Sequence, residues 1–209
     1  MRLRNIPNAE QKINQSKYLL KNSEQYKGKF NEVFDLKQPI HVEIGMGKGD
    51  FIIGSAITNP NINFIGIEKF ASVLVKAIEK LENKELNNLK IINMDANDIE
   101  KIFDHEIDTL YLNFSDPWPK ARHAKRRLTS PNFLKKYQSI FQKTNHIIMK
   151  TDNRKLFEYS VQTFNEGGYH IKSISLNLHD DQPINNIETE YEKKFVAKGY
   201  PIYQIEVEK

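Results

Sequence analysis

Five short apolar segments, spaced evenly along the first 150 residues, limit most strongly how this chain can fold. They are rich in Ile, Val, Phe and Tyr, as buried parallel strands are. The segments are 40–45 (IHVEIG), 62–68 (INFIGIE), 89–94 (LKIINM), 107–114 (IDTLYLNF) and 146–150 (HIIMK). Between them, apolar residues recur with helical spacing in 70–81 and in 133–141. This alternation predicts a doubly wound, mostly parallel α/β sheet, whose ligands bind beyond the carboxyl ends of the strands.

The rest of the chain completes the same sheet. A further helix is expected from about Asn153 to Asn165, and two closing strands are expected within 167–178 and 200–208, around a polar connection at 179–190. These additions give seven strands. No repeat or low-complexity linker interrupts the pattern, and 209 residues suit a single domain.

Composition excludes several kinds of protein. The chain has no cysteine, which removes disulfides, thiolate nucleophiles and cysteine zinc sites. Its six histidines include no close pair at ligand spacing, so we expect no metal. There is no signal-peptide core and no apolar run of about 18 residues, so we expect a cytoplasmic protein that does not enter a membrane. The net charge of +4 is mild, and where the charge lies matters more than its total.

The first predicted strand runs into a glycine-rich loop, VEIGMGKGDF, which contains Gly45, Gly47 and Gly49 and is preceded by Glu43. Glycines in such a loop allow a tight turn and a close approach to a ligand. A P-loop would need Ser or Thr after Gly-Lys, where this chain has Gly49. A dinucleotide fingerprint would need its third glycine where Asp50 stands. Acidic residues in the loop would not attract an anionic pyrophosphate. They suit S-adenosylmethionine, which carries no phosphate and has a cationic ammonium and sulfonium.

Two further acids follow the next two predicted strands. Glu68 ends the second strand, where a carboxylate can accept hydrogen bonds from both ribose hydroxyls, and Asp95 follows the third, placed to reach an adenine amino group. Either acid alone could be an ordinary solvated loop residue. Together with Glu43 and the glycine loop, they predict S-adenosylmethionine as the cofactor.

The fourth predicted strand runs into NFSDPWPKARHAKRRL, residues 113–128. A residue before proline is pushed into an extended conformation, so Asp116 is held out of any helix and is expected beside the departing methyl group. Trp118 offers a flat apolar face, and five of the eight residues from Lys120 to Arg127 carry positive charge of the kind that phosphates attract. The alternative is a rigid turn with a solvated run of charge, although such a run rarely lies at the ligand edge of a sheet.

In combination these motifs resemble the bacterial tRNA (guanine-N7)-methyltransferases. The resemblance covers nearly the whole chain, through VEIGMGKGDF, GIEK, MDA, DPWPKARHAKRRL, KTDNR and TEYEKKF. It implies a class I (Rossmann-like) methyltransferase fold in a single domain, 1–209, in which residues 1–35 form a variable amino-terminal extension. It also implies methyl transfer from S-adenosylmethionine to N7 of a guanine in the tRNA variable loop (position 46 in tRNA numbering), by a monomer or homodimer that binds tRNA.

The resemblance also implies roles for individual residues, with Asp116 as the catalytic residue. The cofactor site is expected to contain Glu43, Gly45, Gly47, Glu68, Asp95 and Asp116. The substrate contacts are expected to be Lys120, Asp152, Thr189, Glu190, Tyr191 and Glu192. The RNA-contacting segment is expected to be Arg122, His123, Ala124, Lys125, Arg126 and Arg127.

Some of these residues have a purely structural explanation as well. The segment TDNR, which contains Asp152, opens a predicted helix, where Asp or Asn is a natural N-cap, and Thr189 with Glu192 matches a capping box. Two rival functions also stay open. One is methylation of an adenine or cytosine amino group in nucleic acid, because DPWP distantly resembles the Asp-Pro-Pro-aromatic loop used for that reaction. The other is RNA binding without catalysis on the same fold.

Overall fold

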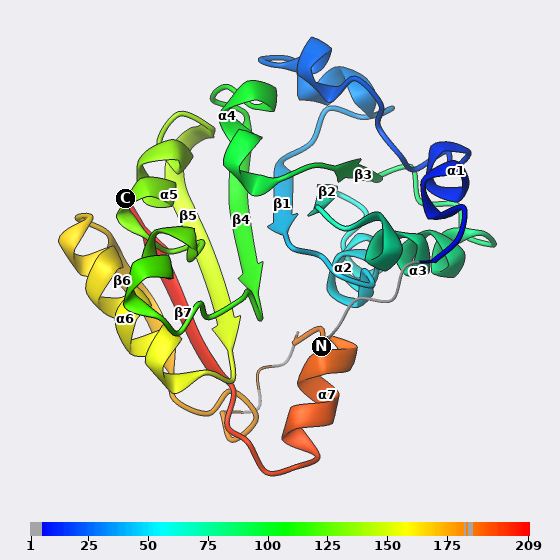
Figure 1. Ribbon diagram of the computed structural model, residues 1–209. Helices are drawn as coiled ribbons and strands as arrows, with labels where there is room; N and C mark the ends of the chain where they lie inside the picture. The colour runs from blue at the N-terminus through cyan, green and yellow to red at the C-terminus, as the bar shows by residue number, and fades with distance from the viewer. Residues whose placement is uncertain (1–5, 182, 184–185) are drawn as a thin grey trace.

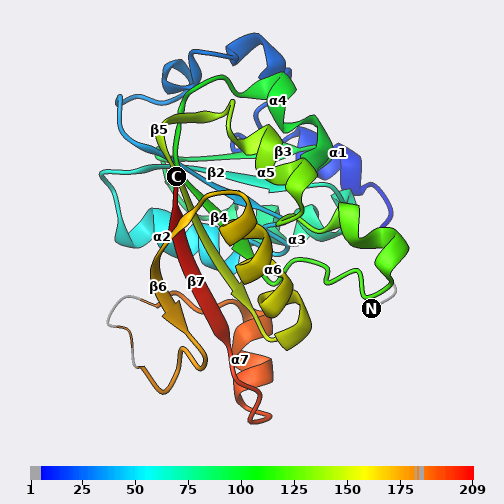
Figure 2. The same cartoon turned by 90° about the vertical axis from the view of Figure 1, so that its left-hand side faces the viewer.

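The computed structural model describes residues 6–181, 183 and 186–209, and it contains one seven-stranded sheet with helices on both faces (Figures 1 and 2). The strands are β1 (Ile40–Ile44), β2 (Asn63–Glu68), β3 (Leu89–Asn93), β4 (Ile107–Asn113), β5 (Phe141–Thr151), β6 (His170–Ser175) and β7 (Tyr203–Glu208). Their order is β3-β2-β1-β4-β5-β7-β6. Strands β1 to β5 are parallel, and β7 runs antiparallel to both of its neighbours. The predicted doubly wound, mostly parallel seven-stranded sheet is confirmed.

The helices divide into two sets that cover opposite faces of the sheet. The longer ones are α2 (Asp50–Thr58), α3 (Ala71–Leu81), α5 (Pro131–Tyr137) and α6 (Arg154–Glu166), and the shorter ones are α1 (Ala9–Asn14), α4 (Ile99–Ile102) and α7 (Glu190–Val196). Apolar side chains of α1, α2 and α3 form one buried core, and those of α4, α5 and α6 form the other. Within the described residues, no helix combines the length and the apolar character needed to cross a membrane.

One predicted boundary is wrong. The pattern in 133–141 predicted a helix that includes Phe141, but α5 ends at Tyr137 and Phe141 begins β5. Phe141 pairs with Ile107 of β4, and the next pair along the strands joins Thr109 to His146, so residues 142–145 take up an irregularity in the ladder. The ring of Phe141 is buried because it belongs to the sheet. Phe141 follows Tyr137 by four residues, a spacing typical of a helix, and for this reason the pattern predicted that the helix continues.

The amino-terminal segment, expected as a variable extension of residues 1–35, packs into the domain where the structure describes it; residues 1–5 lie outside the described part. The Leu20 N–H donates to the Ile91 carbonyl (2.8 Å), and the Ile91 N–H donates to the Tyr18 carbonyl (2.8 Å), which adds a short parallel bridge beside β3. Phe30 is fully buried, and its N–H donates to the Glu106 carboxylate at 2.5 Å. This segment therefore covers the β3 edge of the sheet.

The polar connection expected at 179–190 also differs in part from the prediction. Residues 182, 184 and 185 lie outside the described residues, and the last residue of the range, Glu190, already begins α7. Thr189 caps this helix by accepting the Glu192 N–H at 2.9 Å, as the capping-box pattern predicted.

Candidate active site

A cavity of about 1550 Å³ opens at the carboxyl ends of the parallel strands. Eight predicted site residues line it, and five of them each follow or end a different strand from β1 to β5: Gly45, Glu68, Asp95, Asp116 and Asp152. The topology brings them together because parallel strands present their carboxyl ends at one edge. Pockets for small ligands usually measure about 300–1,000 Å³, so this cavity has room for a cofactor together with a nucleobase.

The glycine loop between β1 and α2 is held against the end of β2. Gly45 and Gly47 adopt left-handed φ angles of 76° and 57°, which side chains rarely tolerate. The N–H groups of Gly45 and Met46 both donate to the Ile67 carbonyl, at 2.8 and 3.0 Å. The Gly47 N–H donates to the Glu68 carboxylate at 3.1 Å. The turn therefore depends on the glycines, and it ties two parts of the expected cofactor site together.

The two acids after β2 and β3 differ in charge environment. Glu68 is buried and also accepts the Phe70 N–H at 2.9 Å, and burial raises its pKa above the ordinary value. Each of its oxygens keeps a further lone pair for a ligand hydroxyl. Asp95 accepts the Asn97 N–H and forms an ion pair with Lys69 at 2.6 Å. Burial opposes ionisation of Asp95, but hydrogen bonds from Lys69 and Asn97 outweigh it and lower the net pKa.

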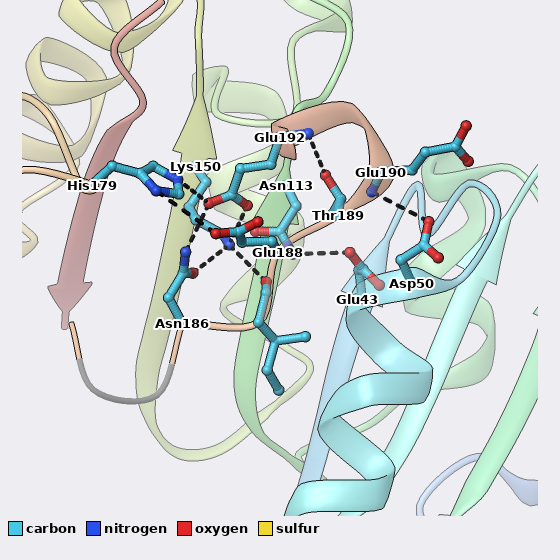
Figure 3. A network of polar contacts seen from close by, with 11 residues as sticks. Glu43, Asp50, Asn113, Lys150, His179, Asn186, Glu188, Thr189, Glu190 and Glu192 are labelled. Carbon is cyan, nitrogen blue, oxygen red and sulfur yellow. Dashed lines mark hydrogen bonds and ion pairs between the residues drawn. The ribbon is translucent and has the colours of Figure 1, made fainter. Parts of the chain in front are cut away.

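Glu43 lies beneath the cavity rather than in its wall. It is buried, and the Asn113 side-chain amide donates to one of its carboxylate oxygens at 2.9 Å (Figure 3). The other oxygen of Glu43 and the amide oxygen of Asn113 are buried without a hydrogen-bond partner among the described residues. Burial raises the pKa of Glu43 to about 7. Two unpaired acceptors next to residues that line the cavity fit a cationic ligand group, because buried acceptors are costly when left without donors.

The loop after β4 has a strained backbone on either side of Asp116. Phe114 and Trp118 have φ angles of 51° and 41°, in the left-handed region that residues with a side chain seldom occupy. Asp116 itself is exposed, and its carboxylate makes no hydrogen bond or ion pair within the part of the chain that the structure describes. The loop thus presents a carboxylate without a partner to the cavity.

Arg127, which is expected in the RNA-contacting segment, holds this loop in place. Its guanidinium donates to the carbonyls of Pro117 and Trp118, both at 3.1 Å, and lies 4.2 Å from the centre of the Tyr159 ring. A planar guanidinium with five donors suits this double contact. Arg127 therefore supports the loop that carries Asp116.

The remaining basic residues of the expected RNA-contacting segment lie on a short helix beside the cavity. The short helix η4 (Ala121–Arg126) carries them at the mouth of the cavity, which Lys125 and Arg126 line. The Arg126 guanidinium lies 4.9 Å from the centre of the Trp118 ring. Lys120 and Arg122 are exposed but do not line the cavity, and His123 and Ala124 are half-buried in the same helix.

Asp152 and Tyr191 meet across the cavity. The cap of α6 is Asn153, which accepts the Leu156 N–H at 2.9 Å, so the Asp152 side chain is left to face the cavity. The Tyr191 hydroxyl donates to Asp152 at 3.3 Å, and the Tyr191 ring lies 5.1 Å from that of Phe114. Burial and the neighbouring Asp152 carboxylate raise the pKa of Tyr191 to about 12.

Glu192, expected as a substrate contact, is fully buried and does not line the cavity. Its carboxylate forms an ion pair with Lys150 at 2.8 Å and accepts hydrogen bonds from Asn186 and His179 (Figure 3). Lys150 also donates to the Ile187 carbonyl at 3.2 Å. Burial opposes ionisation of Glu192, but the charge of Lys150 and the hydrogen bonds outweigh it and lower the pKa of the carboxyl. This pair anchors the start of α7 to β5.

Glu190 also contacts protein rather than the cavity. Its carboxylate pairs with Lys48 of the glycine loop at 2.8 Å, and its N–H lies 3.4 Å from the Asp50 carboxylate (Figure 3). Among the four expected contacts 189–192, only Tyr191 lines the cavity. The segment therefore links the glycine loop and β5 to the wall of the site.

Sequence reasoning missed Asn113 and Lys150 as parts of the site. Each lies at or near the end of a predicted strand and is the first residue of a motif that was singled out, NFSDPWPKARHAKRRL or KTDNR, and this position was the available signal. Among the described residues, no group of three His, Asp or Glu side chains is arranged to hold a metal ion.

Solved structures with the same fold are methyltransferases. One, described as an antibiotic related methyltransferase, aligns with a TM-score of 0.67 and 16% identity over 87% of this chain and 93% of its own. Another, a SAM dependent methyltransferase from Aquifex aeolicus, aligns with a TM-score of 0.55 and 13% identity over 85% of this chain and 91% of its own. At these identities the likeness establishes the class I methyltransferase fold alone.

Sequence comparison goes further. Residues 37–205 match a family model described as putative methyltransferase. The protein named tRNA (guanine-N(7)-)-methyltransferase from Bacillus licheniformis is 49% identical over 100% of this chain and 99% of its own length. Proteins of the same name from Bacillus subtilis and Bacillus velezensis are 50% identical over 100% and 53% identical over 88% of this chain, and the alignments cover 99% and 85% of those proteins. With half of its residues shared over the full length of such relatives, the chain belongs to the tRNA (guanine-N7)-methyltransferase family.

Proposed function

We propose that this protein transfers the methyl group of S-adenosylmethionine to N7 of a guanine in the variable loop of tRNA, at position 46, and so forms 7-methylguanosine. The observation that carries the proposal is the meeting of Glu68, Asp95 and Asp116 at one cavity, in a chain about 50% identical to relatives named for this reaction. The site lies where the fold binds ligands.

The residues present fit S-adenosylmethionine, which supplies an electrophilic methyl group when bound. Glu68 and Asp95 both line the cavity; Glu68 would accept the ribose hydroxyls, and Asp95 would contact the adenine amino group, which would share that carboxylate with Lys69. The unpaired oxygens of Glu43 and Asn113 suit the ammonium. The loop that contains Gly45 and Gly47 lets the backbone approach closely.

Methylation at N7 needs alignment more than proton transfer. Guanine N7 has an in-plane lone pair and no proton, so it would form the N–C bond to the methyl group without a general base from the protein; the bound sulfonium would supply that methyl and keep the electron pair of the C–S bond. Holding the three atoms in line removes much of the entropic barrier. The ring gains positive charge, which the carboxylate of Asp116 would stabilise, or Asp116 would accept hydrogen bonds from the guanine imino and amino groups. Asp152, which follows the neighbouring strand β5 and also lines the cavity, is the second candidate for this role.

The tRNA itself would be held by cations at the mouth of the cavity. Lys125 and Arg126 line it, and Lys120 and Arg122 are exposed beside it. Phosphates are attracted to such a surface whatever the base sequence. We expect the protein to act in the cytoplasm, as a monomer or homodimer.

The decisive experiment is transfer of a labelled methyl group to unmodified tRNA, followed by digestion and nucleoside analysis. The expected product is 7-methylguanosine in the variable loop. Methyl on an adenine or cytosine amino group would favour the rival enzyme. Binding of tRNA with no transfer and no measurable affinity for S-adenosylmethionine would favour an RNA-binding protein without catalysis.

A further inference from the structure

A row of aromatic side chains leads from the cavity outward along α7. Tyr191 lies against Phe114 at the cavity wall, and its ring stacks on that of Phe195, with 4.3 Å between ring centres and 19° between planes. Phe195 in turn meets Tyr200, 5.5 Å away, edge to face. Tyr191 and Tyr200 expose 43% and 52% of their surface. The row is therefore continuous with the cavity and open to solvent.

Lysines flank the same row. Lys194 and Lys198 follow Tyr191 and Phe195 by three residues, a spacing that places them on the same side of the helix. Both are exposed, and no ion pair among the described residues involves them. The Lys198 ammonium lies 5.5 Å from the centre of the Phe195 ring. The acids of α7 point elsewhere, since Glu190 pairs with Lys48 and Glu192 is buried against Lys150. The outer side of the helix is thus cationic as well as aromatic.

Ordinary core packing does not account for this row. Aromatic residues four apart on a helix usually face a core, but α7 stands beyond the carboxyl ends of β4 and β5 in both views (Figures 1 and 2). Exposed apolar patches with a polar rim usually mark a binding surface. Flat rings with interspersed lysines are the combination that binds single-stranded nucleic acid, because every base has a face to stack and every nucleotide a phosphate.

We propose that this surface, the α7 surface formed by Tyr191, Lys194, Phe195, Lys198 and Tyr200, binds unpaired nucleotides of the tRNA that flank the target guanine. The inference rests on the proposed function. The cavity lies between η4, which contributes Lys125 and Arg126, and α7, which contributes Tyr191. A guanine that enters the cavity leaves its stack, so its neighbours lose a stacking partner, and Phe195 and Tyr200 replace it. In this arrangement η4 contacts phosphates of the tRNA, and the α7 surface contacts its unstacked bases.

The aromatic contribution is tested with Phe195→Leu/Tyr200→Leu, which keeps apolar bulk but removes both flat rings. We expect this variant to bind unmodified tRNA and a 12-nucleotide single-stranded RNA at least about fivefold more weakly than wild type, because base–aromatic stacking contributes about 1–3 kcal/mol per base. Binding of a blunt RNA duplex and of S-adenosylmethionine should stay unchanged. Tyr200→Phe keeps the ring and should bind as wild type does. Tyr200→Leu alone serves as the test if the double variant does not fold.

The lysines are tested separately through salt dependence. Lys194→Ala/Lys198→Ala should lower the slope of log affinity against log salt on the single-stranded RNA by about 1.4, because each single-strand phosphate contact contributes about 0.7. The matched control is Lys143→Ala/Lys172→Ala, a change of the same charge on exposed strand residues away from α7, which should leave the slope unchanged.

Several outcomes would overturn the proposal without touching the proposed function. If both α7 variants bind single-stranded RNA and tRNA with wild-type affinity and still form 7-methylguanosine, then the α7 surface does not bind RNA. An equal loss on duplex RNA would exclude stacking of unpaired bases. Loss of self-association with unchanged RNA binding would reassign the surface to a second copy of the chain. If the wild-type protein does not methylate tRNA, the proposed function itself is wrong.

Discussion

Asp116 combines an exposed carboxylate, which has no partner among the described residues, with a backbone that is fixed from both sides. The strained residues Phe114 and Trp118 bracket it, and Arg127 ties the loop from behind. Strain of this kind costs on the order of 1–3 kcal/mol per residue and persists only where the surroundings enforce it. The loop therefore keeps its shape whether or not the Asp116 side chain is present.

We expect Asp116→Ala to lose about 100-fold or more in turnover, since removing one preorganised electrostatic contact typically costs about 10²–10³. The melting temperature should stay unchanged, because no hydrogen bond or ion pair of the described residues is lost. Kinetics and thermal melting are measured on one preparation. Asp116→Asn separates charge from hydrogen bonding, and partial retention of turnover would favour a positioning role. A fall in melting temperature that accounts for the lost activity would make Asp116 a turn residue only.

Glu43 couples the stability of the protein to pH in a direction unusual for an acid. Burial raises its pKa to about 7 in the folded protein, above the ordinary value of 4.5. Between these values the folded state binds more protons than the unfolded state, so the free energy of unfolding falls as pH rises. The full effect of this one group is roughly 3 kcal/mol, because one unit of pKa corresponds to about 1.4 kcal/mol.

Glu43→Gln removes this titration and keeps the shape of the side chain. We therefore expect the free energy of unfolding of Glu43→Gln, relative to wild type, to increase by up to about 3 kcal/mol between pH 5 and pH 8. Urea denaturation of both proteins at the two pH values measures the difference. A gap that does not change with pH would show that Glu43 titrates in the ordinary range.

Helix α7 is too short to be stable alone, and its position depends on the pair formed by Lys150 and Glu192. Seven residues make about two turns, whereas isolated helices shorter than about 12–15 residues are marginal. The two side chains expose 3% and 0% of their surface and are 42 residues apart in sequence. Their contact fixes the helix that carries Tyr191, so it positions the wall of the cavity without touching the ligands.

We expect Lys150→Met to destabilise the protein by about 3–5 kcal/mol, because it leaves the Glu192 carboxylate buried without its cation. Lys150→Met/Glu192→Leu should recover part of this loss, since both buried charges are then absent. Arg154→Ala is the matched control: its pair with Glu158 has the same 2.8 Å separation but exposes 75% and 59% of the two side chains, so at most about 1 kcal/mol should be lost. Equal effects in Lys150→Met and Arg154→Ala, by urea denaturation, would deny the anchoring role.

Across the molecule, positive charge at the ligand edge is divided between residues that face solvent and one that faces protein. Lys125 and Arg122 are exposed at η4, whereas Arg127 is engaged with the loop carbonyls and the Tyr159 ring. Only the exposed cations can release counterions when tRNA binds. The basic run is therefore not a uniform contact surface.

Salt dependence separates these roles. Arg122→Ala/Lys125→Ala should weaken tRNA binding and reduce the slope of log affinity against log salt by up to about 2 units. Arg127→Ala should leave that slope nearly unchanged and lower turnover, because the loop with Asp116 loses its support. Titrations at several salt concentrations, with S-adenosylmethionine binding as the folding control, measure both. If Arg127→Ala reduces the slope as much as Arg122→Ala alone or Lys125→Ala alone, then Arg127 contacts the RNA as well.

The sequence pattern predicted the structural features that depend on neighbouring residues along the chain. It did not predict features that depend on contacts between residues far apart in the sequence. Strands β1 to β4 were predicted because apolar, β-branched runs are visible locally. Helix α2 has apolar residues on most of its faces, including Phe51, Ile52 and Ile53, so no amphipathic period marked it. The acids at strand ends were found by position alone. That Glu192 turns inward depends on Lys150, which its local sequence does not reveal.

The place of β7 between β5 and β6 has a consequence for how the chain is made. During synthesis β6 leaves the ribosome before β7, yet β6 does not pair with the preceding strand, β5; among the described residues it pairs only with β7. Until residues 203–208 emerge, β5 is an open edge with unpaired backbone groups, and β6 has nothing to pair with. We therefore expect the parallel strands to assemble first. Open strand edges pair readily with other chains, so we expect nascent chains that pause before β7 is made to depend most on a chaperone.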